Sequence, residues 1–346
     1  MLRHIWLEES IDRRVNVKCH PGVLGDGVHD DTDGLNEIRN VCFGTAENPH
    51  GRNSKDNLEM FFPSGDFRVR DDGLLFSKVQ GGLITGSGNL CTKITNVTGG
   101  AVIRTNGFSY STMRDLALYG QGVLCDLNYD GTPGGDNLQS NNFYHVFHSG
   151  GTIGTRVGFG QFMGSENKWF NCQWEGCSDT GIGVYNYNAL CNALIGCNAA
   201  SCGVAVNIVA GAIACDADTS FQANGWDIVI ANSAWGTFKF HCRTESLQFC
   251  KAGNGAVVTL VGCSQVNKPI DAPNVVFFEG AFPGAILNAS GCNSAAGQIT
   301  GYVRGSVSNS SFGNVSVAGV LASPYSLQLN SVMANDVFIL SQTLQG

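Results

Sequence analysis

Hydrophobic residues near the start of the chain recur at helical spacing. Leu35, Ile38 and Cys42 lie three or four positions apart, so they share one face of a helix. The pattern predicts a short amphipathic helix over residues 32–43, and Gly44 is expected to end it, because glycine is favoured just after a helix. The apolar stripe predicts that this helix packs against the elements that follow it.

The pattern changes to strand spacing after this helix. Residues 58–69, LEMFFPSGDFRV, predict a strand, a tight turn and a second strand. From about residue 80, short apolar runs bounded by Gly or Asn predict many short strands without a further helix. A lone amphipathic helix ahead of such strands fits the covered end of a β-solenoid, because an open terminal coil would expose apolar core and unpaired strand edges.

Cysteines repeat at the spacing of solenoid coils. Cys172 and Cys197 are 25 residues apart, as are Cys177 and Cys202. The later members of the series are Cys242, Cys263 and Cys292. We interpret the series as a ladder of inward-facing cysteines at one corner of successive coils. The alternative is a structural zinc site formed by the first four thiols.

A cluster of carboxylates precedes the predicted helix. Asp26, Asp30 and Asp31, together with Thr32, lie where the first amide groups of the helix lack partners, and side-chain oxygens are favoured there. We therefore assign these residues a structural role as cap and turn residues, in preference to a catalytic one.

Three segments among the first 70 residues carry a resemblance to a known family. They are residues 15–18 (VNVK), residues 25–32 (GDGVHDDT) and residues 62–67 (FPSGDF). Their order resembles the opening segment of the pectate-lyase-like right-handed parallel β-helix superfamily, which includes polygalacturonase-like enzymes and many phage tailspikes. The resemblance implies an all-β protein, a right-handed parallel β-helix with a short N-terminal capping helix, and a homotrimer of the tailspike type.

This fold would divide the sequence into three parts. Residues 15–302 are expected to form the β-helix domain. Residues 1–14 are predicted to be an arm or connector that attaches the protein to a virion, with a disordered terminus as the alternative. Residues 303–346 are predicted to be a β-rich end cap or a segment that joins subunits, because both ends of a solenoid need cover.

Composition narrows the choice of partners and compartment. The net charge of the 346 residues is -8, which argues against nucleic acid or an anionic membrane as the main partner. Met1–Ser10 lacks the apolar run of a signal peptide, and no stretch is long and apolar enough to span a bilayer. The 14 cysteines are therefore expected to be reduced and buried. These observations fit a protein that is made in a host cytoplasm and is later located on a virion tail or otherwise outside the cell.

One predicted strand combines candidate catalytic groups. Apolar and polar residues alternate in FKFHCRTE, so His241, Arg243 and Glu245 share its outward face. Asp216 and Asp218 are candidate substrate-binding acids that are expected about one coil earlier. The group offers a base, a cation for a uronate carboxylate and an acid. A surface salt-bridge ladder is the alternative.

A second candidate set contains the acids Glu166, Glu175 and Asp179. Trp174 precedes Glu175, and an aromatic platform beside a carboxylate is typical of sugar sites. Two such acids at the right separation would act as a glycoside hydrolase pair. Tyr144 is a further candidate for substrate binding. For Trp174, a place in the core is the alternative.

These observations leave three functions open. The first is a tailspike-like protein that attaches to a host, binds its surface polysaccharide and cleaves it by hydrolysis or β-elimination. The second is a non-catalytic structural or adhesive spike of a virion, which is favoured by the missing Gly-His-Gly and Arg-x-Lys motifs of polygalacturonase-like enzymes. The third is a cellular pectate-lyase-like enzyme. No cofactor is expected, except calcium if the protein is a lyase.

Overall fold

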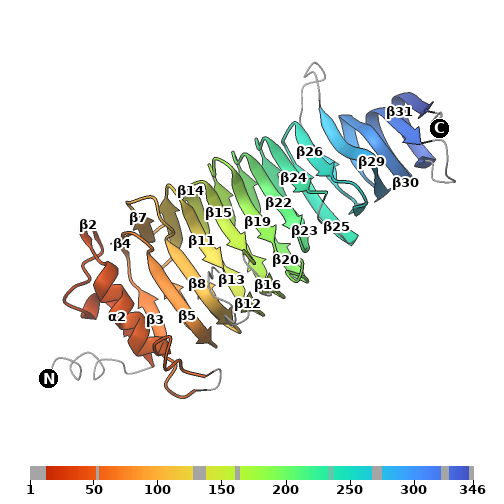
Figure 1. Ribbon diagram of the computed structural model, residues 1–346. Helices are drawn as coiled ribbons and strands as arrows, with labels where there is room; N and C mark the ends of the chain where they lie inside the picture. Colours follow the sequence, from red (N-terminus) through yellow and green to blue (C-terminus); the bar gives the residue numbers. More distant parts are fainter. Residues whose placement is uncertain are drawn as a thin grey trace. The chain divides into compact units, whose positions relative to one another are not determined.

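The computed structural model describes residues 13–51, 54–127, 138–159, 164–232, 234, 237–266, 275–320 and 327–342. In this part of the chain parallel strands follow one another in coils (Figure 1). The predicted all-β class, the right-handed parallel β-helix and its short N-terminal helix are confirmed. The chain divides into two compact units, Met1–Ser178 and Asp179–Gly346. Residues 1–12 of the predicted arm lie outside the described residues.

The first unit begins around the predicted helix. Helix α2 (Thr32–Phe43) has the predicted bounds, and Gly44 follows it with a φ of 82°. The three residues of its apolar stripe are fully buried, and α2 packs against β3 (Glu59–Phe62) and β5 (Leu74–Gln80). The helix therefore covers the apolar interior of the first coils. No helix among the described residues is long and apolar enough to cross a membrane.

Two of the carboxylates before α2 hold turns in place. Asp26 accepts hydrogen bonds from the amides of Val28 and His29, both at 2.8 Å. The His29 and Val28 amides lower the pKa of Asp26. Asp30 accepts hydrogen bonds from the amide and the hydroxyl of Thr32 at 3.2 and 2.6 Å. These bonds fix the backbone just before the helix.

Asp31 departs from the capping prediction. It is the N-cap residue of α2, but its carboxylate makes no capping bond to the helix. Instead it accepts hydrogen bonds from the amides of Leu24 at 2.7 Å, Gly25 at 3.2 Å and Arg68 at 3.2 Å. Burial raises the pKa of Asp31, and these amides offset part of that effect. Asp31 therefore joins the preceding loop to strand β4 (Gly65–Val69).

The other elements of the first unit are short. They are β1 (Arg14–Asn16), the 3-10 turn η1 (Val17–Cys19), β2 (Asp26–Asp30), β6 (Leu83–Gly86), β7 (Thr92–Asn96), β8 (Ile103–Ser109), β9 (Thr112–Arg114), β10 (Ala117–Gly120), β11 (Val123–Leu127), β12 (Leu138–Gln139), β13 (Asn142–Tyr144), β14 (Phe147–Gly150), β15 (Ile153–Val157), β16 (Gly164–Ser165), β17 (Lys168–Phe170) and β18 (Gln173–Glu175).

Parallel register fixes which side chains of the first unit face inward. Strands β4, β7, β10, β14 and β18 pair in that order, one coil apart. Their aligned inward residues, each at most 1% exposed, are Phe67, Ile94, Leu118, His148 and Trp174. The rings of His148 and Trp174 are stacked, with centroids 5.2 Å apart and planes at 11°.

A chain of hydrogen bonds satisfies the polar atoms of this inward column. Trp174 Nε1–H donates to Thr155 Oγ1 at 3.0 Å, and the Thr155 hydroxyl donates to His148 Nε2 at 3.2 Å. A carbonyl oxygen only accepts, so His148 Nδ1 carries the proton and donates to the Gln173 carbonyl oxygen at 3.2 Å, and Nε2 of the neutral ring accepts from Thr155. Burial lowers the pKa of His148 to about 4, so the ring is neutral near pH 7.

A buried polar ladder runs along one corner of the coils. Asn141 Oδ1 accepts from the Ser111 amide at 3.0 Å, and Asn167 Oδ1 accepts from Asn141 Nδ2 at 2.8 Å. The Ser111 hydroxyl oxygen in turn accepts from the Gly82 amide at 2.9 Å. These side chains satisfy amide groups that face the interior where the chain turns.

The second unit continues the same architecture. Its strands are β19 (Thr180–Tyr185), β20 (Asn192–Ile195), β21 (Asn198–Ala200), β22 (Val204–Ala210), β23 (Ile213–Gln222), β24 (Trp226–Ile230), β25 (Thr237–Thr244), β26 (Gln248–Ala252), β27 (Val257–Val261), β28 (Ser264–Gln265), β29 (Val276–Ser290), β30 (Asn293–Val320) and β31 (Leu327–Gln342). Strand β30 runs across residue 302, where the sequence suggests the end of the β-helix domain.

The predicted cysteine ladder is present in the second unit. Cys242, Cys263 and Cys292 are buried on successive coils. The Cys263 thiol donates to the Phe240 carbonyl oxygen at 3.2 Å, and the Cys292 thiol donates to that of Leu260 at 3.5 Å. Burial raises the pKa of Cys242 to about 11. These thiols therefore stay protonated and pack as small apolar groups.

We predict that acid destabilises the protein through His148. Its pKa is about 4 in the folded state against an ordinary value of 6.5, so the unfolded chain binds more protons between these values. The free energy of unfolding should fall as the pH decreases from 6.5 to 4, by at most about 1.4 kcal/mol per pH unit. His148→Phe keeps a ring on Trp174 and should remove this part of the slope, measured by urea denaturation at several pH values.

The matched control is Ile94→Val in the same inward column, because it perturbs the packing without changing a titratable group. The control should keep the wild-type slope. An unchanged slope in His148→Phe would contradict a buried, neutral His148.

Candidate functional site

Strand β25 alternates between buried and exposed side chains along its whole length. Its apolar residues are buried, whereas Lys239, His241 and Arg243 are exposed. This is the alternation that the sequence predicts. Glu245, just after the strand, is half-buried and accepts a hydrogen bond from Gln222 Nε2 at 3.3 Å.

Asp216 reaches the same face from the preceding coil. It directly follows Cys215, which pairs with Phe240, the residue before His241. Immediately afterwards the register of the two strands shifts, as it does at a β-bulge. Asp218 lies in this irregular stretch and is exposed.

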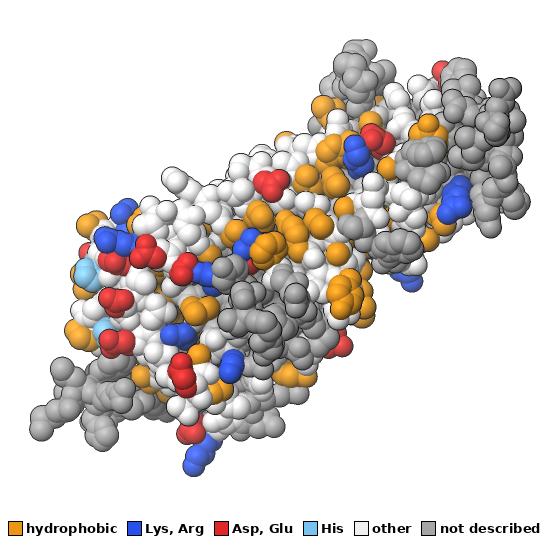
Figure 2. Space-filling view, in the orientation of Figure 1, with side chains coloured by type: hydrophobic (Ala, Val, Ile, Leu, Met, Phe, Trp, Pro, Cys, Tyr) orange, Lys and Arg blue, Asp and Glu red, His pale blue; other side chains and the backbone are white. Residues whose placement is uncertain are grey.

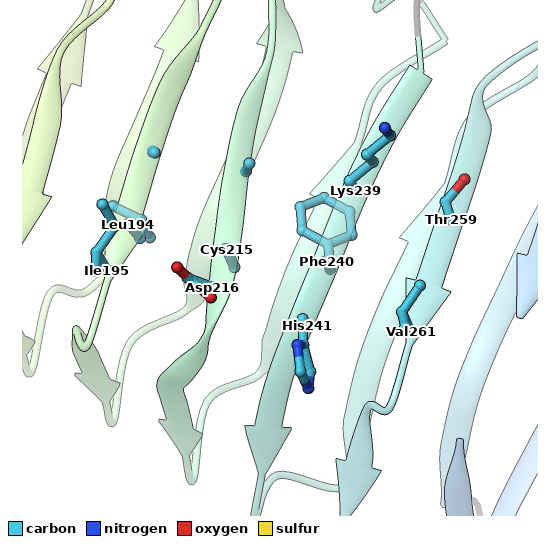
Figure 3. A pocket seen from close by; sticks show the side chains of 11 residues that line it. Leu194, Ile195, Cys215, Asp216, Lys239, Phe240, His241, Thr259 and Val261 are labelled. Atoms are coloured by element: carbon cyan, nitrogen blue, oxygen red, sulfur yellow. The ribbon is translucent and has the colours of Figure 1, made fainter. Parts of the chain in front are cut away.

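Asp216, Lys239 and His241 line one groove of about 250 Å³ (Figure 3). The rest of the lining is mainly apolar; Val261 is 49% exposed and Ile195 is half-buried, whereas Leu194 and Phe240 are buried beneath them. The accessible apolar surface of Val261 and Ile195 can contact the C–H face of a sugar, while the three polar groups act on its substituents.

Gly262 keeps space for the imidazole of His241. A Cβ atom at Gly262 would lie 3.0 Å from His241 Nε2, and the φ of this glycine is 63°. Both the close approach and the left-handed backbone favour glycine. The position of His241 therefore depends on the next coil.

The structure brings only part of the predicted set into the groove. Asp216 and His241 line it, whereas Asp218, Arg243 and Glu245 are not among its lining residues.

Sequence reasoning missed two polar residues of the groove. Lys239 lies two positions before His241, so the same alternation identifies it as outward-facing. Thr259 of β27, on the next coil, pairs with Lys239. Only the register between the two strands reveals that they are neighbours.

Comparison with known proteins gives similarity of fold alone. No protein-family model and no curated protein matches the chain. Among solved structures, the catalytic domain of Agl-KA has a TM-score of 0.59 and 12% identity, covering 95% of this chain and 68% of that chain. The chain has a right-handed parallel β-helix fold.

Two other similar structures have lower TM-scores. ORF18 of Geobacillus virus E2 has a TM-score of 0.48 and 15% identity, and the match covers 99% of this chain and 63% of that chain. The A-module of the Azotobacter vinelandii mannuronan C-5 epimerase AlgE4 has a TM-score of 0.48 and 14% identity, with 95% and 97% covered.

In the second predicted set the three acids are exposed, whereas Trp174 is buried. Glu166 and Glu175 are exposed in the first unit, and Asp179 is exposed at the start of the second. Glu166 accepts a hydrogen bond from the Ser140 hydroxyl at 2.6 Å. This bond links two successive coils and gives Glu166 a structural role.

The assignment of Trp174 to substrate binding is wrong. Its side chain is 0% exposed and packs inside the first unit, so no ligand can stack on it. Outward aromatic residues on neighbouring strands include Tyr119 of β10 and Phe147 of β14, which are half-buried with ring centroids 5.9 Å apart. Glu175 is close enough to raise the pKa of Tyr119, although burial contributes more to that shift.

Tyr144 is half-buried on the outside of β13. Its ring stacks on Phe170 of the next coil, with centroids 4.7 Å apart and planes at 10°. The stacking uses one face of the Tyr144 ring. A role in substrate binding stays a prediction for this residue.

A metal site does not form among the described residues. They contain no group of three or more His, Cys, Asp or Glu side chains that could hold a metal ion. Calcium binding stays a prediction for the case that the protein is a lyase.

We predict that the folded protein has few reactive thiols. Cys91 and Cys191 are exposed and Cys19 is half-buried, whereas the ladder cysteines are buried. Labelling with a thiol reagent should be fast at the two exposed sites, and the double variant Cys91→Ser, Cys191→Ser should lose it. All 14 thiols should react in urea. Stoichiometric zinc in the purified protein, or fast labelling of the ladder, would contradict this account.

Proposed function

We propose that the second unit binds an acidic polysaccharide across the groove and cleaves it by β-elimination. The observation that supports the proposal is that Asp216, Lys239 and His241 line one groove whose remaining lining is mainly apolar. Ligand pockets usually combine a mainly apolar lining with a few polar groups that fix orientation. The three side chains include a titratable base and a cation, which elimination needs.

Each polar group has one role in the proposed reaction. His241 takes the proton from carbon 5 of a uronate unit, and Asp216 favours the imidazolium that forms. The electron pair of that C–H bond forms the double bond between carbons 4 and 5, while the bond from carbon 4 to the leaving oxygen breaks. Lys239 pairs with the uronate carboxylate and stabilises the charge that develops there. Water supplies the proton for the leaving oxygen.

The placement of cations favours an acidic ligand. The chain carries a net charge of -8, so it does not attract a polyanion over long distances. Lys239, His241 and Arg243 nevertheless lie together on one face of β25. A carboxylate would therefore be held by direct contacts at this row.

We also propose that the protein acts on a virion, because residues 15–67 resemble the opening segment of tailspikes. In that setting residues 1–14 would attach it to the particle, and three copies would form a homotrimer. The second candidate function is a non-catalytic adhesive spike. It is favoured by the bonds that hold Glu166 and Glu245 to neighbouring coils, as in a structural ladder.

The test is incubation of the full chain with acidic and neutral polysaccharides. We expect acidic substrates alone to give both new reducing ends and the ultraviolet absorbance of unsaturated uronates. His241→Ala should lower the rate by at least about 100-fold, since a general base contributes about that much. Lys239→Ala should weaken the action on acidic substrates as well.

The matched control is Lys251→Ala, which removes a cation of the same unit that pairs with Glu279 at 3.0 Å. It should leave the rate unchanged. Reducing ends without the absorbance would replace elimination with hydrolysis. Full activity in His241→Ala would overturn the role of the groove. Binding without cleavage of any polysaccharide would favour the adhesive spike.

A further inference from the structure

A pocket in the first unit has charged walls that the proposed reaction does not use. Its volume is about 400 Å³, which is within the range of small-molecule sites. Its charged lining residues are Asp72, Arg104, Asp126 and Arg156. Acidic and basic side chains are also interspersed over the face of the first unit that Figure 2 shows.

Three of these residues form a column across successive coils. Arg104 of β8, Asp126 of β11 and Arg156 of β15 are aligned in register. Asp126 is only 2% exposed, and Arg156 binds it through two hydrogen bonds of 2.8 and 2.5 Å. The Arg156 guanidinium also lies 4.1 Å from the ring centroid of Phe159. This side of the pocket is therefore rigid before any ligand binds.

Glycine turns form another part of the lining. A Cβ atom at Gly100 would lie 1.7 Å from the Asp71 carbonyl oxygen, and one at Gly122 would lie 2.2 Å from that of Gly99. The turns stack so closely that only glycine fits at these positions. This part of the wall is therefore bare backbone beside the arginines.

Asp72 differs from Asp126 in its surroundings. The Asp72 side chain is 82% exposed, whereas that of its partner Arg104 is 14% exposed. An ion pair with so exposed a carboxylate contributes little to stability. An arginine at a pocket wall is a good partner for a planar carboxylate. Asp72 thus occupies the position where a ligand carboxylate would pair with Arg104.

We propose that this pocket binds the carboxylate of an acidic sugar unit, with Arg104 as its partner and Asp72 as a competitor that the ligand displaces. The backbone wall at Gly99 and Gly100 then faces the sugar ring. The inference rests on the proposed function only for the choice of an acidic sugar, since binding in this pocket requires no cleavage.

The test compares galacturonic acid with galactose, which differ only at carbon 6. Affinities are measured by ligand-observed NMR titration of the full chain. Asp72→Asn removes the competing charge and should tighten galacturonate binding by about three- to tenfold. Its melting temperature should not change, because the exposed pair contributes little stability. Arg104→Gln should weaken galacturonate binding by about tenfold or more.

The matched control is Asp71→Asn, which neutralises the neighbouring exposed aspartate outside the pocket lining. It should leave galacturonate affinity at the wild-type value. Equal affinities of the wild type and Asp72→Asn would overturn the inference, and so would galactose binding as tightly as galacturonate. Cleavage of polysaccharide without galacturonate binding in this pocket would overturn the inference but leave the proposed reaction standing. Binding without cleavage would support it and remove the proposed reaction.

Discussion

In-register stacking of parallel coils is the constraint on which the rest of this structure depends. Each coil leaves inward amide groups that the next coil must satisfy, because an unpaired buried polar group is costly. Asn141 and Asn167 meet this need at one corner of the first unit, and Cys263 and Cys292 donate to carbonyl oxygens in the second. The buried ladders therefore hold each strand at a fixed register.

The same stacking determines which outward side chains become neighbours on the surface. Once the inward residues are fixed, every second side chain faces outward and aligns with its counterparts on adjacent coils. Arg104 and Asp126 become neighbours in this way, and so do Asp126 and Arg156. Polar residues that are 22 to 30 positions apart in sequence are thus joined into sites without any dedicated loop. A bulge beside Asp216 interrupts the regular alignment and sets the edge of one such site.

Local patterns predicted what depends on local geometry. The helix over residues 32–43 and the outward face of β25 follow from periodicity alone. Trp174 was open to two interpretations because β18 has only three residues, too few to show an alternation. The bonds of Asp31 to Arg68 and the pairing of Lys239 with Thr259 depend on register between coils, which varies with coil length. The register between coils cannot be derived from the sequence of one chain.

The central claim is that an acidic glycan contacts His241 in the groove. The chain contains seven histidines, and His241 is the one in the second unit, so the imidazole NMR spectrum is simple to assign with His241→Asn. On titration with a short acidic oligosaccharide we expect the His241 signals to shift in a saturable way, while those of buried His148 stay in place. Saturable binding of the oligosaccharide without a shift of the His241 signals would contradict the account.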